Sequence, residues 1–285
     1  IEPYLYEVDT YTTLDYDFAD EFYASDNDNW SGGGCSAITK KITTEKGEKR
    51  IIGRNMDLSL SNKPAYIIKT ADPGFYKTIG ITYFDKFGED VEEIEKRGFL
   101  SVNSFKFAPF LCTDILNEEG FYIEVNMRTT EVDDKGQSKF GCKGTNPKSK
   151  IRICETMIPR YLADRVKSVN EAISLLNELN IYSPNGDGLD WNLCFLVADK
   201  TGKHGVIEIA KDKIIFTEYH AQTNFYLADE FSKNEEFKAG IGRMSHINAH
   251  FDEVSDELSM FNLIDEISYF QMYSENCKFD PRSEL

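Results

Sequence analysis

The chain has 285 residues, a length that can bury a substantial core as one large domain or two smaller ones. Its net charge of −17 comes without a Lys/Arg-rich run, which argues against binding to nucleic acid or to anionic membranes, because both rest on basic patches. No apolar run approaches the ~18–20 residues of a transmembrane helix, and the first residues lack the basic start and apolar stretch of a signal peptide.

The cysteines and histidines show no metal-site spacing. The six cysteines are Cys35, Cys112, Cys142, Cys154, Cys194 and Cys277, and none forms a C-x-x-C pair or fits a small disulfide framework. Cys112, Cys154 and Cys194 lie in apolar contexts that predict core residues. His246 and His250 lack a nearby H-E-x-x-H motif, which indicates ordinary surface or core positions. The sequence therefore predicts no metal and no cofactor. It leaves the compartment open, with a secreted or cell-envelope location favoured over a cytoplasmic one.

Residues 1–34 differ from the rest of the chain. They contain nine Asp and Glu residues and no Lys or Arg, so this segment carries −9 of the net charge. They also contain eight aromatic residues, more than a purely solvated tail normally carries. We expect the segment to pack against something and then to pass through a flexible tract at 26–34. An ordinary N-terminal arm and a pro-segment that covers a site both remain open at this point.

Local patterns predict strands along the first half of the chain. The expected strands are residues 36–43, 50–54, 65–70, 78–84 and 121–128, the first two joined by a polar turn at 45–48. Residues 86–98 are acidic and predict an exposed excursion, and residues 133–150 predict a surface loop. Residues 104–111 contain three phenylalanines and fit either an aromatic segment that lines a pocket or simple core packing.

The second half of the chain begins with helical spacing. The expected elements are helices at 152–166 and 169–179, a meander of strands at 191–219, and mostly helices at 240–273. Ser168 and Asn170 are candidate caps for the second helix. Strands, helices, further strands and final helices indicate an α+β layered fold.

The stretch with the most chemical information places Cys35 directly after three glycines, at the head of the expected hairpin. Glycines tolerate unusual turns, so the backbone can be strained against the Cys35 thiol. Attack of that thiol on the Gly34 carbonyl gives a thioester, and its hydrolysis leaves a chain that starts at Cys35 with a free α-amino group. This amine titrates near ~7.7–8.0, so it can act as the general base for the thiol beside it. The pattern therefore predicts a self-processing cysteine nucleophile.

The second strand of the hairpin supplies charged partners for this cysteine. Arg54 is a candidate for the cation that lowers the thiol pKa, and Asp57 is a candidate for the acceptor that holds the amine. The oxyanion of such a reaction also needs fixed donors. A free buried cysteine beside a surface Arg–Asp pair is the alternative that these residues leave open.

Two segments of this stretch resemble a known family. Residues 34–37, G-C-S-A, followed by residues 53–57, G-R-N-M-D, resemble the choloylglycine hydrolase family of linear amide hydrolases, which includes bile-salt hydrolases and penicillin V acylases. The family belongs to the N-terminal-nucleophile hydrolases, so the resemblance implies an α+β fold of the four-layer αββα sandwich type. It also implies hydrolysis of a linear amide carbon–nitrogen bond in an acylated small molecule, such as a conjugated bile acid, penicillin V or an N-acyl amine.

Further segments resemble the family in the expected order. Residues 117–120, N-E-E-G, precede a strand that reaches Asn126, and residues 191–199, with the turn at 201–202, resemble the family's strand ending in D-x-x-G. Residues 223–224, T-N, resemble a pair whose Asn amide donates to the oxyanion, and Arg243 resembles a second arginine near the nucleophile.

The resemblance implies a role for each of these positions. Asn126 and Asn224 stabilise the oxyanion, Arg54 and Arg243 lie near the thiolate, and Asp57 anchors the amine. A simple turn residue remains the alternative for Asn224, and a solubilising residue near a helix start remains the alternative for Arg243.

Two departures from the family pattern concern the ends of the chain. Most bile-salt hydrolases begin at the cysteine after losing only the initiator Met, whereas 34 residues precede Cys35, which favours a true pro-segment. The chain ends 42 residues after Arg243, earlier than the resemblance implies, which leaves open whether C-terminal strands are missing. We therefore expect a pro-segment at 1–34 and a single hydrolase domain at 35–285.

The expected partner is a small-molecule N-acyl amide, and whether the chain forms a homo-oligomer stays open. Two alternatives to an amidase also stay open. One is an acyltransferase of the same fold, which passes the acyl group to an amine instead of water. The other is a catalytically silent binding protein that keeps its N-terminal arm uncleaved.

Overall fold

The largest element is an eight-stranded sheet. The structure is a computed structural model that describes residues 5–10, 34–57, 65–83, 108–128, 139–183, 192–233 and 240–276. In order across the sheet, the strands are β1 (Leu5–Thr10), β4 (Ala65–Thr70), β5 (Thr78–Tyr83), β6 (Asp114–Asn117), β7 (Tyr122–Met127), β10 (Leu193–Ala198), β11 (His204–Ala210) and β12 (Lys213–Thr217). Neighbouring strands run antiparallel, except that β1 is parallel to β4.

A second, three-stranded sheet is built on a long hairpin. Its order is β13 (Ala221–Gln222), β2 (Gly34–Thr44) and β3 (Gly47–Asp57), all antiparallel. The hairpin turns at residues 45–46, and Gly47 then has a φ of +109°, a value that favours glycine. The register pairs Ala37 with Arg54. Because residues two apart on a strand and residues directly opposite share a face, Cys35 and Arg54 point to the same face of the hairpin.

Helices and short connections complete the described part of the chain. The helices are α4 (Ile158–Ala163), α5 (Val169–Glu178), α6 (Asp229–Ser232), α7 (Ile241–His250) and α8 (Glu257–Asn276), with 3-10 turns η2 (Ala108–Leu111), η3 (Glu155–Met157) and η4 (Phe251–Glu253). Two short strands, β8 (Arg152–Cys154) and β9 (Asn180–Tyr182), pair in parallel.

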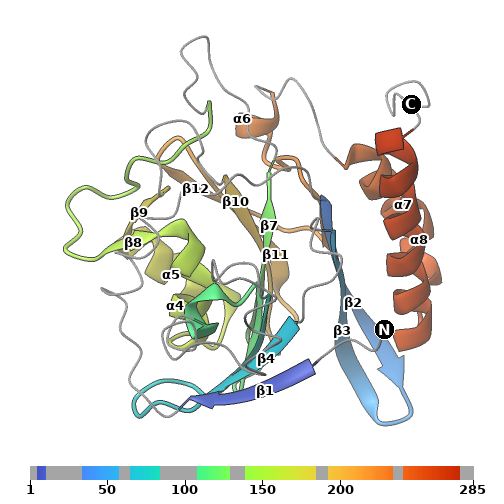
Figure 1. The fold of residues 1–285 in the computed structure, drawn as a ribbon, viewed down its shortest axis with the longest axis horizontal. Coiled ribbons are helices and arrows are strands. Elements are labelled where there is room, and N and C mark those ends of the chain that lie inside the picture. Colours follow the sequence, from blue (N-terminus) through green and yellow to red (C-terminus); the bar gives the residue numbers. More distant parts are fainter. Residues whose placement is uncertain are drawn as a thin grey trace, which may run out of the picture.

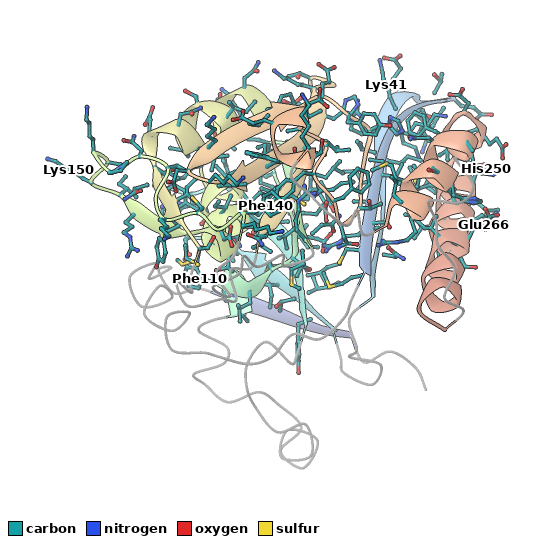
Figure 2. All side chains as sticks on the ribbon, turned by 90° about the horizontal axis from the view of Figure 1, so that it is seen from above. Lys41, Phe110, Phe140, Lys150, His250 and Glu266 are labelled. Carbon is teal, nitrogen blue, oxygen red and sulfur yellow. The ribbon has the colours of Figure 1, made fainter. Side chains whose placement is uncertain are left out.

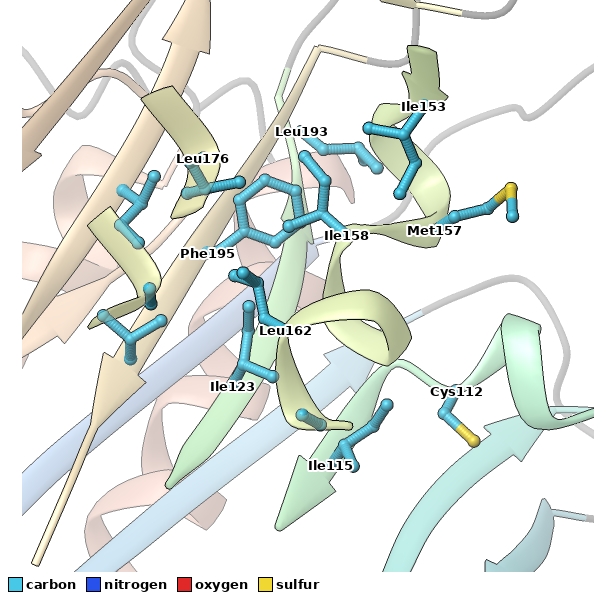
Figure 3. Packing of buried hydrophobic residues seen from close by; sticks show 14 of the residues in the cluster. Cys112, Ile115, Ile123, Ile153, Met157, Ile158, Leu162, Leu176, Leu193 and Phe195 are labelled. Atoms are coloured by element: carbon cyan, nitrogen blue, oxygen red, sulfur yellow. The ribbon is translucent and has the colours of Figure 1, made fainter. Parts of the chain in front are cut away.

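One face of the large sheet packs against α4 and α5. Ile158 and Leu162 of α4 and Leu176 of α5 lie in one buried cluster with Phe195 of β10 and Ile123 of β7 (Figure 3). Because strand side chains alternate between faces, the neighbours of these strand residues point the other way. This cluster is the main hydrophobic core.

The other face of the large sheet meets the second sheet. Cys194 and Leu196 of β10 and Val206 of β11 pack with Ala37 of β2. The outer face of the second sheet is covered by α7 and α8, through a cluster that includes Ile38, Ala221, Met244, Ile247, Met260 and Ile264. Figure 1 shows the resulting order of layers, from α4 and α5 through the two sheets to α7 and α8.

The α+β organisation with antiparallel sheets is confirmed. The hairpin, the strand at 65–70, the meander and the C-terminal helices are confirmed as well. The helix expected at 152–166 is wrong at its start, because residues 152–154 form β8 through pairing with β9. The α-helix begins at Ile158, followed by Pro159, whose fixed φ suits the first turn of a helix.

The two expected caps of α5 have different outcomes. Ser168 is the N-cap, and its hydroxyl accepts a hydrogen bond from the Glu171 backbone N–H at 3.3 Å. The expectation for Asn170 is wrong, because this residue lies within the helix and its side chain instead accepts from Lys203 Nζ at 2.6 Å.

Two phenylalanines show how loops are tied to the core. Phe110 belongs to the main hydrophobic cluster, which favours core packing for the end of the aromatic segment at 104–111. Phe140 is buried against Tyr226, with ring centroids 4.8 Å apart, so the stretch at 133–150 is not simply a surface loop. In Figure 2 both phenylalanines lie among other side chains, whereas Lys150 projects outward.

Several expectations fall outside the described residues. These are the segment at 86–98, most of residues 1–33, residues 104–107, Trp191 and Cys277. In the ranges that the structure describes, no helix is both long and apolar enough to cross a bilayer. Within the same ranges, no group of three His, Cys, Asp or Glu side chains is placed to hold a metal ion.

Candidate active site

Cys35 is buried at the start of β2, with only 4% of its surface exposed. Its backbone N–H donates a hydrogen bond to Asn224 Oδ1 at 2.9 Å. Asn224 follows β13, whose Ala221 pairs with Ile38 of β2, so the second sheet itself brings the two residues together. The nitrogen that the sequence predicts as a future α-amine therefore has an acceptor.

Arg243, on the first turn of α7, binds the carbonyl side of the nucleophile's backbone and also binds Asn224. Its Nη1 donates to the Cys35 carbonyl oxygen and to Ser36 Oγ, each at 2.6 Å. Its Nη2 donates to Asn224 Oδ1 at 2.5 Å. A planar guanidinium can serve these acceptors together, whereas a lysine ammonium presents a single point charge. Arg243 thus fixes the peptide unit that carries the thiol.

The carboxamide of Asn224 also links the two sheets. Its Nδ2 donates to the backbone oxygen of Met127, at the end of β7, at 2.5 Å. Its Oδ1 accepts from the Cys35 N–H and from Arg243. The carboxamide therefore has partners at both ends, and its orientation is set by the surrounding structure.

Arg54 lies on the same face of the hairpin as Cys35 and reaches across to the large sheet. Its Nη1 donates to the Thr113 carbonyl at 3.1 Å and to the Asp114 carboxylate, and its Nη2 donates to the Val125 carbonyl at 2.6 Å. Its Nε lies 3.2 Å from Glu124 Oε2. This cation is thus held by two carboxyl groups and two backbone oxygens.

The electrostatics around the thiol follow from burial and these charges. Burial raises the pKa of the Cys35 thiol, Arg54 and Arg243 lower it, and Glu124 raises it further, so the thiol pKa lies above its ordinary value. Burial also raises the pKa of Glu124 to about 8, although Arg54 opposes the shift. In the described arrangement the thiol is therefore protonated at neutral pH.

The two remaining predicted residues, Asn126 and Asp57, are described only by their positions on β7 and β3. Asn126 is buried on β7, two residues from Glu124, so it points to the same face, toward the second sheet. Asp57 ends β3, and its backbone pairs with that of Gly34, while its side chain is outside the described part. Three of the five predicted partners of the nucleophile therefore gather around it, and Asn126 lies on the face that borders them.

Comparison with known families decides the assignment. The family described as linear amide C–N hydrolases, choloylglycine hydrolase family, matches residues 35–227, which is more than half of the chain. The chain belongs to this family. The match begins at Cys35, the residue that the hairpin and Asn224 hold. No curated protein matches the chain.

Solved structures that resemble this family member include three chains. One is a variant of conjugated bile acid hydrolase from Clostridium perfringens, with 14% identity, 84% of this chain and 72% of that chain covered, and a TM-score of 0.42. Penicillin V acylase from Agrobacterium tumefaciens has 13% identity, 85% and 66% coverage, and a TM-score of 0.43. A second variant of the Clostridium perfringens protein has 14% identity, 88% and 68% coverage, and a TM-score of 0.35.

Three polar residues of this candidate site are not predicted from the sequence. They are Ser36, which accepts from Arg243, and the acids Asp114 and Glu124, which hold Arg54. The sequence does contain evidence for a role of Glu124. It is a charged residue within the strand sequence F-Y-I-E-V-N, and a charge buried in a strand needs a partner. Ser36 and Asp114 carried no comparable signal.

Proposed function

We propose that this chain is an autoprocessing cysteine amidase, which hydrolyses a linear amide bond of an acylated small molecule. Substrates of this class include a conjugated bile acid, penicillin V and an N-acyl amine. The observation that carries the proposal is the position of Cys35, where the family match begins and where Asn224 already accepts from the backbone nitrogen. Because 34 residues precede it, Cys35 becomes N-terminal only when the bond after Gly34 is cleaved.

The first step of the proposal is self-cleavage. The Cys35 sulfur attacks the carbonyl carbon of Gly34, a C–S bond forms, the C–N bond breaks, and the thiol proton passes to the released nitrogen. Water then hydrolyses the thioester, which leaves a carboxylate on Gly34 and restores the thiol of Cys35. Residues 1–34 act in this proposal as a pro-segment that keeps the enzyme a zymogen, and residues 35–285 form the hydrolase domain.

The second step is turnover of substrate. The freed α-amine takes the thiol proton, and the thiolate attacks the amide carbonyl of the substrate. The amine leaving group departs with that proton, and water then hydrolyses the acyl thioester. Arg54 supports the thiolate in this proposal, because a neighbouring cation lowers a thiol pKa.

The remaining residues receive roles that suit their chemistry. The contact of Asn224 Oδ1 with the Cys35 nitrogen supports a role in orienting the α-amine, and Asp57 at the end of the paired strand is the proposed ionic anchor for it. Asn126 and Asn224 are the proposed donors to the oxyanion. Arg243 keeps the peptide unit of Cys35 fixed through the reaction.

The proposed fold type follows from the order of layers. Helices, two sheets and helices pack in that order, with the nucleophile on the inner face of the smaller sheet. This order supports the four-layer αββα sandwich of the N-terminal-nucleophile hydrolases.

The experiment that tests the proposal is intact-mass measurement of purified protein under denaturing conditions. We expect a species that begins at Cys35 in the wild type, and an uncut chain in Cys35→Ala. The processed protein is then offered penicillin V, a glycine-conjugated bile acid and an N-acyl ethanolamine, with and without an added amine acceptor. We expect release of the free acid from at least one of them.

Each other outcome has a defined meaning. An uncut wild-type chain without amidase activity contradicts the proposal and supports a silent binding protein. Cleavage followed by transfer of the acyl group to the added amine, in preference to water, supports an acyltransferase instead. Because β1 pairs with β4, mass measurement under native conditions also reports whether the cleaved segment stays bound.

A further inference from the structure

A buried ion pair lies beside the segment that carries Asn224. Arg128 follows β7 and Glu208 lies on β11, and Arg128 Nη2 donates to Glu208 Oε1 at 2.5 Å, with both side chains fully buried. Removing one partner of such a pair leaves an uncompensated charge in the interior, so the two residues act as a unit. Among the described residues, the side chains that bind the backbone of Cys35 are Asn224 and Arg243, so the ion pair lies one step further from the nucleophile.

Glu208 also binds the backbone downstream of Asn224. Its Oε1 accepts from the Leu227 N–H at 2.7 Å, and its Oε2 accepts from the Ala228 N–H at 2.7 Å. The ring of Tyr226, just before these residues, lies under the Arg128 guanidinium, with 4.1 Å between the guanidinium carbon and the ring centroid. The ion pair therefore holds three consecutive residues of this segment.

The same segment is tied to the end of β7 at a second point. Asn224 Nδ2 donates to the backbone oxygen of Met127, the residue before Arg128. The Arg128 N–H in turn donates to the Asn192 carbonyl at 3.0 Å, which anchors this end of β7 beside β10. The segment at 224–228 is thus fixed to β7 both at Asn224 itself and through the Arg128–Glu208 pair.

We propose that Glu208 is a positioning residue: with Arg128 it fixes the 224–228 segment so that Asn224 Oδ1 meets the backbone nitrogen of Cys35. Glu208 touches none of the reacting atoms and acts only through Asn224. Its effect on catalysis rests on the proposed function, but its effect on the contact between Asn224 and Cys35 does not.

The first test is hydrogen exchange of the residue 35 amide in the Cys35→Ala chain, which cannot cleave itself. We expect Glu208→Gln to speed exchange of this amide by about tenfold or more, because the hydrogen bond to Asn224 is weakened. The matched control is Asp164→Asn. Asp164 pairs with Arg160 at 3.0 Å, also with both side chains fully buried, but at α4 on the far side of the large sheet.

The second test is turnover by the processed enzyme. We expect Glu208→Gln to lower kcat by about tenfold or more while KM stays near the wild-type value, because the substrate contacts are kept and the amine is misplaced. Asp164→Asn is expected to lower stability and to leave kcat per folded molecule unchanged. Should Glu208→Gln fail to fold, Glu208→Asp replaces it, because it keeps the charge beside Arg128 and shortens the reach to Leu227 and Ala228.

The outcomes separate this proposal from the function on which it builds. Unchanged exchange at residue 35 in the Glu208 variant, or an equal rise in Asp164→Asn, overturns the positioning role. Faster exchange in the Glu208 variant alone supports it, even if the wild type hydrolyses no amide. Absence of amidase activity in the wild type overturns the proposed function by itself.

Discussion

Arg243 and Asn224 hold the two ends of one residue, since Arg243 donates to the Cys35 carbonyl and Asn224 accepts from the Cys35 N–H. The two side chains also bind each other, so neither can shift without the other. Hydrogen bonds to a charged donor are roughly twice as strong as neutral ones, which makes this triangle a stiff frame. At the scale of residues, the site is therefore organised around the backbone of Cys35 as much as around its thiol.

Glu124 gives the folded protein a pH-dependent stability. Its carboxyl pKa is raised by burial from 4.5 to about 8, whereas unfolding returns it to an ordinary value. Between these values the folded state keeps a proton that the unfolded state has lost. The free energy of unfolding is therefore expected to fall as the pH rises from about 4.5 to about 8, by at most about 1.4 kcal/mol per pH unit for this proton. Glu124→Gln, which is neutral at every pH, is expected to flatten this part of the profile in urea unfolding.

The control for this pH profile is Glu230→Gln. Glu230 is half exposed and pairs with Lys213 at the surface, where an ion pair contributes little to stability. We expect its profile to run parallel to that of the wild type. If the free energy of unfolding changes with pH equally in the wild type and in Glu124→Gln, the Glu124 carboxyl is ionised in the folded state at pH 6, which contradicts the expectation.

At the scale of elements, α7 delivers Arg243 through its first turn. Gly240, the N-cap of this helix, has a φ of +77°, and a Cβ added there would lie 2.5 Å from Arg243 Nη2. Gly240→Ala therefore combines backbone strain of about 1–2 kcal/mol with displacement of Arg243. We expect lower stability and a kcat lowered by about tenfold or more, because the frame around Cys35 is disturbed.

Gly47→Ala separates the effect of backbone strain from the effect of displacing Arg243. Gly47 has a φ of +109° at the tip of the hairpin, and an added Cβ would meet no atom within 4 Å. The same kind of strain is thus introduced far from Arg243. We expect thermal unfolding to show destabilisation in both variants and steady-state kinetics to show a loss of kcat in Gly240→Ala alone. A matching loss in both variants would mean that strain, and not Arg243, limits activity.

How much of the structure the sequence predicts depends on how local each element is. The hairpin at 34–57 is predicted by its local sequence pattern. Cys35 and Arg54 are predicted as partners because both lie on this hairpin. β8 was missed because its three residues form a strand only through pairing with β9, which lies far along the chain. The contacts of Arg54 with Asp114 and Glu124 were missed for a related reason: they exist only because two separate sheets face each other.

At the scale of the whole molecule, the site depends on the spacing between layers. Arg54 reaches from the second sheet to Asp114 of β6 and to Val125 of β7, and Asn224 reaches to Met127. These contacts form only when the second sheet packs directly against the large one. The helices α7 and α8 cover the outer face of the second sheet and thereby support that position.

At Gly53, the side chains of α8 pack closely against the hairpin. A Cβ added there would lie 2.7 Å from Met260 Cγ and 2.8 Å from Ile264 Cγ1, so even one methyl group does not fit. Gly53→Ala is therefore expected to cost about 1–3 kcal/mol of stability by overpacking the interface between β3 and α8. Urea unfolding of the purified variant measures this cost.

Met260→Ala tells overpacking apart from a backbone effect. This change leaves a cavity at the same contact and is itself expected to cost about 2–5 kcal/mol. In the double variant the methyl group added at position 53 enters the vacated space, so the double variant should lose less stability than the two single variants together. Additive losses across the four proteins would instead mean that Gly53 is required by the strand itself. A smaller loss in the double variant would show that Gly53 is needed for the contact between β3 and α8. The next residue, Arg54, binds the large sheet on the opposite face of the same strand.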